Sequence, residues 1–166
     1  KGTSRVLKQQ SPKTRIVVCE PDNAQLLGSG IPQLREAAGS PAESHPNFRP
    51  HLVQGWSPDF IPKLAEDAMA TGTVDQVLPI DGKKALQLTR DLAQKEGIFT
   101  GISGGSTFSV ALDLAKTAEP GTVILCMLPD TGERYLSSPL FEDVGEDMNE
   151  AELALSQSTP GFHLNE

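Results

Sequence analysis

The fold is decided by residues 74–100, VDQVLPIDGKKALQLTRDLAQKEGIFT. The first residues of this stretch, 74–80, predict a strand. Asp81 is a candidate N-cap for a helix over residues 83–95, and Gly97 is a typical helix stop. The residues after Gly97, up to the end of the stretch, predict a second, short strand. The order strand, helix, strand is typical of a parallel sheet.

The same alternation continues on both sides of this stretch. Residues 15–20 predict a buried strand, because the continuous apolar run at residues 16–19 suits a parallel sheet covered on both faces. The other predicted elements are the later turns of a helix at residues 4–10, a helix opened by Pro62, a helix at residues 108–116 and a buried strand at residues 122–128. The predicted fold class is therefore α/β, a parallel sheet flanked by helices.

One long segment, residues 21–58, interrupts the alternation. It is rich in Gly, Ser, Pro and Asn and has no long periodic pattern. Long loops inside compact domains are often functional lids or binding loops, whereas a disordered surface insertion is the simpler interpretation. The segment contains Trp56, the single tryptophan, which is either a core or lid aromatic or part of a loop that touches a ligand.

The composition limits the classes of function. With 166 residues the chain is long enough for one domain with a hydrophobic core. Its net charge of -8, without any basic cluster, argues against nucleic acids and anionic membranes as partners. No apolar stretch approaches the roughly 20 residues of a spanning helix. A cytoplasmic protein is expected, with an organelle possible because the natural N-terminus is not visible.

The sulfur and imidazole side chains show no spacing typical of a metal site. Cys19 and Cys126 each lie in an apolar run and are expected to be free buried thiols, although a disulfide is an alternative. The three histidines, His45, His51 and His163, are not spaced as metal ligands, so no metal is expected.

The end of the chain is acidic. Carboxylates are frequent after Phe141, and residues 149–156 predict one short helix. The last residues, 158–161, have the composition of a loop. Residues 142–166 are therefore expected to form a surface tail that docks on a partner subunit.

Three segments carry the polar and glycine residues that could serve chemistry. They are GISGGS at residues 101–106, PDTGER at residues 129–134 and GWSPD at residues 55–59. The first two follow predicted strands, so they are expected at the edge of the sheet where ligands bind. Glycines there allow close approach to a ligand, and a helix N-terminus favours negative charge. The structural alternatives are a tight turn capped by Ser103 or Ser106 and a turn capped by Asp130.

The three segments, in this order and spacing, resemble the second half of cysteine synthase, also called O-acetylserine sulfhydrylase, a fold-type II pyridoxal-phosphate enzyme. The likeness covers residues 1–141. It implies that these residues form the large, C-terminal α/β domain and that the N-terminal half is absent.

The resemblance also implies roles for particular residues around pyridoxal 5'-phosphate. The position of Ser103 faces the pyridine nitrogen in this family, and Gly101 borders the cofactor ring. Pro129 and Asp130 are expected as wall and hydrogen-bond support, and Gly55 matches a glycine beside the entrance. The family continues from that glycine with small residues, whereas this chain has Trp56 and a negative charge nearby, so its substrate is less certain than its cofactor.

The implied reaction makes cysteine from O-acetylserine and sulfide through an aminoacrylate. None of the lysines lies in the family's Schiff-base motif, so no catalytic residue is assigned to this chain and the chain alone is expected to be inactive. The implied partners are the amino-acid substrate, sulfide and the missing N-terminal half or a second subunit, in a homodimer. The alternatives are a cystathionine β-synthase-like enzyme and a non-catalytic truncated module that binds a full-length subunit.

Overall fold

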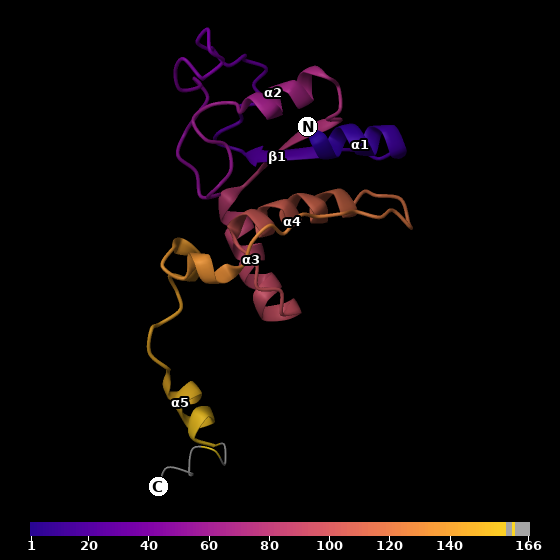
Figure 1. Ribbon diagram of the computed structural model, residues 1–166. Coiled ribbons are helices and arrows are strands. Elements are labelled where there is room, and N and C mark those ends of the chain that lie inside the picture. Colours follow the sequence, from indigo (N-terminus) through magenta and orange to yellow (C-terminus); the bar gives the residue numbers. More distant parts are fainter. Residues whose placement is uncertain (159–160, 162–166) are drawn as a thin grey trace.

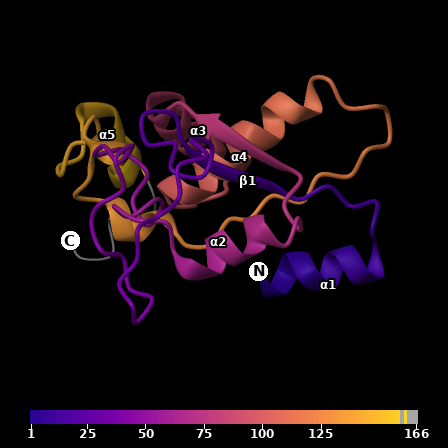
Figure 2. The same ribbon diagram turned by 90° about the horizontal axis from the view of Figure 1, so that it is seen from above.

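A two-stranded parallel sheet forms the centre of the protein in the computed structural model, which describes residues 1–158 and residue 161. Strand β1 (Val17–Pro21) pairs with strand β2 (Gln76–Ile80), with Val18 opposite Val77 and Cys19 opposite Leu78. Helices α1 and α2 lie on one side of the sheet and α3 and α4 on the other (Figures 1 and 2). The predicted fold class is therefore confirmed.

The helices follow the local sequence signals closely. Their bounds are Gly2–Gln10 for α1, Lys63–Ala70 for α2, Gly82–Glu96 for α3, Ile102–Ala115 for α4 and Glu150–Gln157 for α5; the short 3-10 helices η1 and η2 span Gly132–Tyr135 and Pro139–Phe141. As predicted, the Asp81 carboxylate accepts hydrogen bonds from the first amides of α3, and Gly97 ends this helix with a left-handed φ of 69°. Pro62 flanks α2 instead of occupying its first turn.

Helix α4 begins six residues before its predicted start at residue 108. The glycine-serine segment was expected to be a turn because glycine is a poor helix former. Instead, Gly104 and Gly105 lie within α4, where they let the helix approach the side chains of Thr100 and Thr89. The requirement for close packing thus overrides the weak helix propensity.

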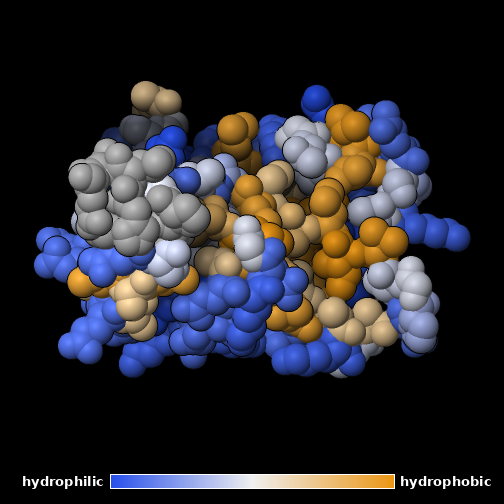
Figure 3. Space-filling view, turned by 90° about the horizontal axis from the view of Figure 1, so that it is seen from below, coloured by the Kyte–Doolittle hydropathy of each residue, from blue (hydrophilic) through white to orange (hydrophobic). Residues whose placement is uncertain are grey.

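Two predicted strands are absent from the described structure. Residues 98–100 contribute only an isolated antiparallel bridge, between Thr100 and Thr131. Residues 122–128 are not part of the sheet and are not buried, with Val123 92% and Leu125 94% exposed. Figure 3 shows hydrophobic side chains gathered in a band on one face of the molecule. The prediction of a buried strand here was wrong, because an apolar run is buried only where other segments cover it.

The long segment between β1 and α2 contains no helix or strand, yet it is packed. Ala24, Leu26 and Ile61 form a small hydrophobic cluster beneath it. The buried carboxylate of Glu20 accepts hydrogen bonds from the amides of Leu27 and Gly28, at 2.9 and 2.8 Å. These contacts favour a structured loop over a disordered insertion.

The remaining sequence expectations are met in part. Cys19 and Cys126 are free but only half buried, and burial raises the pKa of the Cys19 thiol to about 11. Helix α5 confirms the predicted tail helix, and it projects away from the rest of the molecule (Figure 1). Of the predicted final loop, Thr159 and Pro160 lie outside the described residues.

Among the described residues no cluster suited to a metal ion is found, and none of their helices could cross a membrane.

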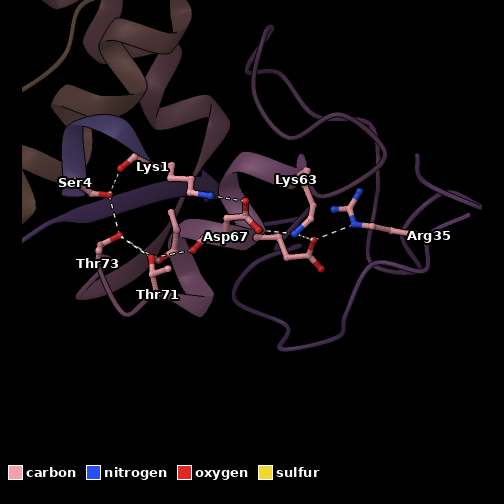
Figure 4. A network of polar contacts seen from close by, with 9 residues as sticks. Lys1, Ser4, Arg35, Lys63, Asp67, Thr71 and Thr73 are labelled. Atoms are coloured by element: carbon pink, nitrogen blue, oxygen red, sulfur yellow. Dashed lines mark hydrogen bonds and ion pairs between the residues drawn. The ribbon is translucent and has the colours of Figure 1, made fainter. Parts of the chain in front are cut away.

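A network of ion pairs joins α1 to α2 (Figure 4). The Lys1 ammonium donates to an Asp67 carboxylate oxygen at 2.6 Å, and Lys63 binds the other oxygen. Glu66, the neighbour of Asp67 on α2, accepts from Arg35 Nε at 2.9 Å. Hydrogen bonds from Lys1 and Lys63 lower the pKa of Asp67 from 3.8 to about 2.

Replacing Asp67 is expected to make the melting temperature depend less on pH between pH 5 and pH 2. Because the pKa of Asp67 is depressed by folding, its stabilising effect is present above about pH 4 and is lost as the pH falls through 2. Asp67→Asn should therefore lower the melting temperature at pH 5 but hardly change it at pH 2, as measured by circular dichroism. Asp147→Asn, in the exposed tail, serves as the control, and an equal loss at both pH values would contradict the assignment.

Candidate functional site

The start of α4 and the segment that precedes η1 form a corner at one end of the fold. The carbonyl of Asp130 accepts from the Gly101 amide at 3.4 Å and from Thr100 Oγ1 at 3.2 Å. The amide of Gly132 donates to the carbonyl of Phe99 at 3.2 Å. Two segments that lie about 30 residues apart in the sequence, and that were predicted to meet at an edge, are therefore brought together.

Gly101 is required in this corner by close packing. A Cβ built at this position would overlap the Asp130 carboxylate and the ring of Tyr135 more closely than real side chains approach one another. Its φ of -78° is ordinary, so the need for glycine comes from space and not from backbone strain. The space that a side chain would take at the N-terminus of α4 is filled by the Asp130 carboxylate and the Tyr135 ring.

Ser103 lies in the first turn of α4 and is only 5% exposed. Its backbone carbonyl accepts from Thr107, but its own hydroxyl makes no hydrogen bond with any described residue. It is not a helix cap, because α4 has no side-chain cap, and Ser106 instead donates to the carbonyl of Ile102 at 2.8 Å. The Ser103 hydroxyl is thus available to a ligand as donor or acceptor.

Asp130 is held by Tyr135 and caps no helix. The Tyr135 hydroxyl donates to Asp130 Oδ2 at 2.6 Å, while Oδ1 is buried and has no hydrogen-bond partner. Such an unsatisfied buried oxygen is uncommon and marks a place where a further group could bind. The negative Asp130 carboxylate, which accepts this hydrogen bond, raises the pKa of Tyr135 to about 12.

The pKa of Tyr135 can be measured directly because this chain contains a single tyrosine. We expect its phenol absorbance to titrate near pH 12. Asp130→Asn removes the negative charge that opposes ionisation, and it should bring the titration back toward about 10. Asp143→Asn, which changes an exposed carboxylate elsewhere, is the matched control. A wild-type titration near 10 would show that the hydrogen bond between Tyr135 and Asp130 is not formed.

The Gly55 loop contacts the hydrophobic core through Trp56. Gly55 has a φ of 84°, and Trp56 packs against the core cluster that includes Ile102 and Tyr135. Trp56 is thus half-buried against the core, which favours the core or lid interpretation. The structure shows no direct contact between Gly55 and Ser103.

His51 was not singled out from the sequence as a site residue. Its Nε2 lies 3.0 Å from the carbonyl of Ser57, and because a carbonyl only accepts, Nε2 must carry the proton. Its Nδ1 is buried without a partner. His51 lines a pocket of about 380 Å³ at the carboxyl ends of β1 and β2, together with Asp22, Asp81 and Lys83. The strand-end rule was the only sequence signal for this pocket.

Comparison with known proteins decides the family. Residues 1–130 match the family described as pyridoxal-phosphate dependent enzymes. The chain belongs to this family. Its cofactor is therefore pyridoxal phosphate, and the resemblance seen in the sequence to a fold-type II enzyme is confirmed.

Several relatives describe the family more narrowly. O-ureido-L-serine synthase from Streptomyces lavendulae is 39% identical over 97% of this chain, and a cysteine synthase from Staphylococcus aureus is 32% identical over 84%. A crystal structure of O-ureido-L-serine synthase superposes with a TM-score of 0.74 at 38% identity, covering 93% of this chain and 42% of that one. An O-acetylserine-dependent cystathionine β-synthase from Helicobacter pylori gives 0.65 at 31% identity, with 84% and 39% covered.

The chain spans less than half of the curated relatives it matches, 44% of the Streptomyces enzyme and 39% of the Staphylococcus enzyme. It is thus comparable to one part of such an enzyme.

Proposed function

We propose that residues 1–141 form the C-terminal domain of a pyridoxal-phosphate-dependent synthase. This enzyme replaces the substituent on the β-carbon of an activated serine. Residues 142–166 would be an acidic tail outside this domain. The observation that carries the proposal is the unpartnered hydroxyl of Ser103 in the first turn of α4, beside the corner that Gly101 and Asp130 form.

The residues of this corner fit the cofactor. Gly101 has no Cβ, and this lets the Asp130 carboxylate and the Tyr135 ring lie against the N-terminus of α4, where Gly101 would border the cofactor ring through its backbone. The pyridine nitrogen needs one hydrogen-bonding group, and the Ser103 hydroxyl has no other partner in the described part of the chain. Pro129 and the Asp130 carboxylate, held by Tyr135, would form the adjacent wall, and Gly55 would lie at the entrance.

The chemistry follows from the neutrality of Ser103. The cofactor, when bound, withdraws electrons from the substrate's α-carbon. A hydroxyl leaves the pyridine nitrogen largely unprotonated, whereas a carboxylate would protonate it. The weaker electron sink suits loss of a β-substituent followed by addition of a nucleophile.

The lysine that binds the cofactor covalently must come from outside these residues. No lysine of this chain lies in the family's Schiff-base motif, and six of the eight, Lys1, Lys8, Lys63, Lys84, Lys95 and Lys116, are paired with carboxylates. Such pairs stabilise the charged ammonium, whereas a nucleophilic amine must be neutral. We therefore propose that the chain alone is inactive and that the complete enzyme, a homodimer, supplies the lysine.

Two products follow from the relatives. Sulfide as nucleophile would give cysteine, as the likeness to cysteine synthase suggests. Addition of hydroxyurea through its hydroxyl oxygen would give O-ureido-L-serine, and this second product is favoured by the higher identity to the synthase of that name and by a match that includes most of the tail. Trp56 and Asp59, at the entrance we propose, are consistent with a nucleophile other than sulfide.

The test is a product assay on the complete enzyme. O-acetylserine is supplied with sulfide, with hydroxyurea or with homocysteine in separate assays, and the amino acids formed are identified by mass spectrometry. We expect acetate release with sulfide and with hydroxyurea, and a higher kcat/KM for hydroxyurea. Exclusive use of sulfide would leave cysteine as the product, and use of homocysteine alone would show a cystathionine-forming enzyme. No acetate release with any nucleophile would contradict the proposed reaction.

A further inference from the structure

Ser57 has a backbone conformation that its local sequence disfavours. Its φ is 36°, and among the described residues it is the only one other than glycine with a positive φ. Pro58 follows it, and a residue before proline is restricted to extended conformations. A strained residue of this kind persists only where its surroundings hold it, and such residues gather at ligand clamps and switch regions.

Two hydrogen bonds hold the loop that contains Ser57. The Nε2–H group of His51 donates to the Ser57 carbonyl at 3.0 Å, and the Trp56 amide donates to the Val53 carbonyl at 3.3 Å. Val53 is fully buried in the main core cluster, against which Trp56 also packs. No other hydrogen bond from the described residues reaches the backbone of residues 54–58. The His51 imidazole therefore closes this loop across its two ends.

The His51 ring is itself held in place by the long segment between β1 and α2. It meets the ring of Phe48 edge-on, with ring centroids 6.4 Å apart and planes at 78°. Phe48 packs in turn against the small hydrophobic cluster beneath that segment. His51 Nδ1 has no partner among the described residues, so its Nε2–H group makes the only hydrogen bond of this ring. His51 thus links the packed part of the long segment to the loop that carries Gly55 and Trp56.

We propose that His51 is a positioning residue for the β-replacement reaction. Its Nε2–H group holds Ser57 in the left-handed region, and this fixes Gly55 and Trp56 at the entrance through which the nucleophile reaches the cofactor. The inference rests on the proposed function, which takes Gly55 to lie at that entrance. His51 acts through the loop and contacts no reacting atom.

Loss of this donor would release the loop. The Ser57 carbonyl is the only polar group of its peptide unit, because Pro58 has no N–H. Without the hydrogen bond, Ser57 relaxes toward the extended conformation that precedes proline, and Trp56 moves with it. A misplacement of about 1 Å at a positioning group can cost about 100-fold in rate.

Two variants of the complete enzyme separate the donor from the ring of His51. His51→Phe keeps a planar ring beside Phe48 but has no donor, whereas His51→Gln keeps an N–H donor but has no ring. Hydrogen exchange by mass spectrometry follows the amides of residues 55–57. We expect about 10-fold faster exchange in His51→Phe and a rate near that of the wild type in His51→Gln. Unchanged exchange in His51→Phe would overturn the proposal.

Steady-state and single-turnover kinetics distinguish positioning from a general structural role. His51→Phe should lower kcat/KM for hydroxyurea by about 10-fold or more, while acetate release from O-acetylserine in a single turnover without nucleophile stays at the wild-type rate. His51→Gln should restore kcat/KM. An equal loss in both steps, or a failure of His51→Gln to restore the nucleophile step, would contradict the positioning role.

Ser57→Gly tests the strain itself. Glycine adopts a φ of 36° without cost, so the loop of this variant depends less on the His51 donor. Adding His51→Phe to Ser57→Gly should therefore accelerate exchange less than His51→Phe does alone. Equal acceleration in both backgrounds would overturn the proposal. Because exchange needs no activity, faster exchange in an enzyme that releases no acetate would count against the proposed function alone, and unchanged exchange in an active enzyme against the role of His51 alone.

Discussion

Gly105→Ala is expected to lower the free energy of unfolding of the chain by about 2 kcal/mol. A Cβ at this position would overlap Thr89 Oγ1 and lie 2.8 Å from Thr89 Cβ and 3.0 Å from the Ala85 carbonyl oxygen. Thr89 is buried and donates to that carbonyl at 2.7 Å, so it has little room to move. Overpacking a tight site costs about 1–3 kcal/mol, and relieving it by separating α3 from α4 forfeits further contacts. The better helix propensity of alanine offsets up to about 1 kcal/mol.

The controls separate overpacking from a general effect of alanine. Gly2→Ala, also in a helix but with no atom within 4 Å of the new Cβ, should be neutral or stabilising. Adding Thr89→Ala to Gly105→Ala should recover part of the loss, and a double-mutant cycle by urea denaturation measures this coupling. Additive losses in the cycle would show that Thr89 is not the group that Gly105 accommodates.

Ser103→Asp is expected to reduce kcat of the complete enzyme by about 100-fold or more, the scale of losing one preorganised polar contact at a reacting centre. The carboxylate would protonate the pyridine nitrogen and change the electronic demand of the cofactor. It would also bring a second negative charge near the corner of Asp130, with only the N-terminus of α4 to favour it. Steady-state kinetics and the cofactor content of the purified variant measure the effect.

The conservative variant decides whether the hydroxyl is responsible. Ser103→Thr retains the hydroxyl and should keep kcat within about 10-fold, whereas Ser103→Asp should retain the cofactor yet turn over slowly. If Ser103→Asp matched the wild type in kcat, the Ser103 hydroxyl would not face the reacting part of the cofactor. Loss of cofactor in every variant would show that Ser103 acts in binding alone.

Local signals in the sequence predicted the elements whose ends are set locally. Asp81 caps α3 with its own side chain and Gly97 ends it through its own backbone, so neither depends on distant residues. The predicted start of α4 at residue 108 was wrong. Gly104 and Gly105 are poor helix formers, so the sequence favoured a turn, but tertiary packing requires glycines at these positions of the helix. The predicted burial of residues 122–128 was also wrong. Burial depends on which other segments cover an apolar run, and the described residues leave most of this run exposed.

In the candidate site, too, the sequence predicted some features and missed those that depend on tertiary packing. The two strand-end segments were predicted to meet, and Thr100, Gly101 and Asp130 do meet. The hydrogen bond from Tyr135 to Asp130 and the half-buried His51 were missed, because both depend on tertiary contacts that no sequence motif indicates. The roles of Ser103, Gly101, Gly55, Pro129 and Asp130 toward the cofactor remain proposals.

We infer that this chain holds one side of a pyridoxal-phosphate site but not the lysine that binds the cofactor. Borohydride reduction with pyridoxal phosphate, followed by intact mass and peptide mapping under denaturing conditions, tests it most directly. We predict one stoichiometric adduct in the complete enzyme, on a lysine outside residues 1–166, and none in the 166-residue chain alone. A stoichiometric adduct on any lysine of this chain would contradict the account.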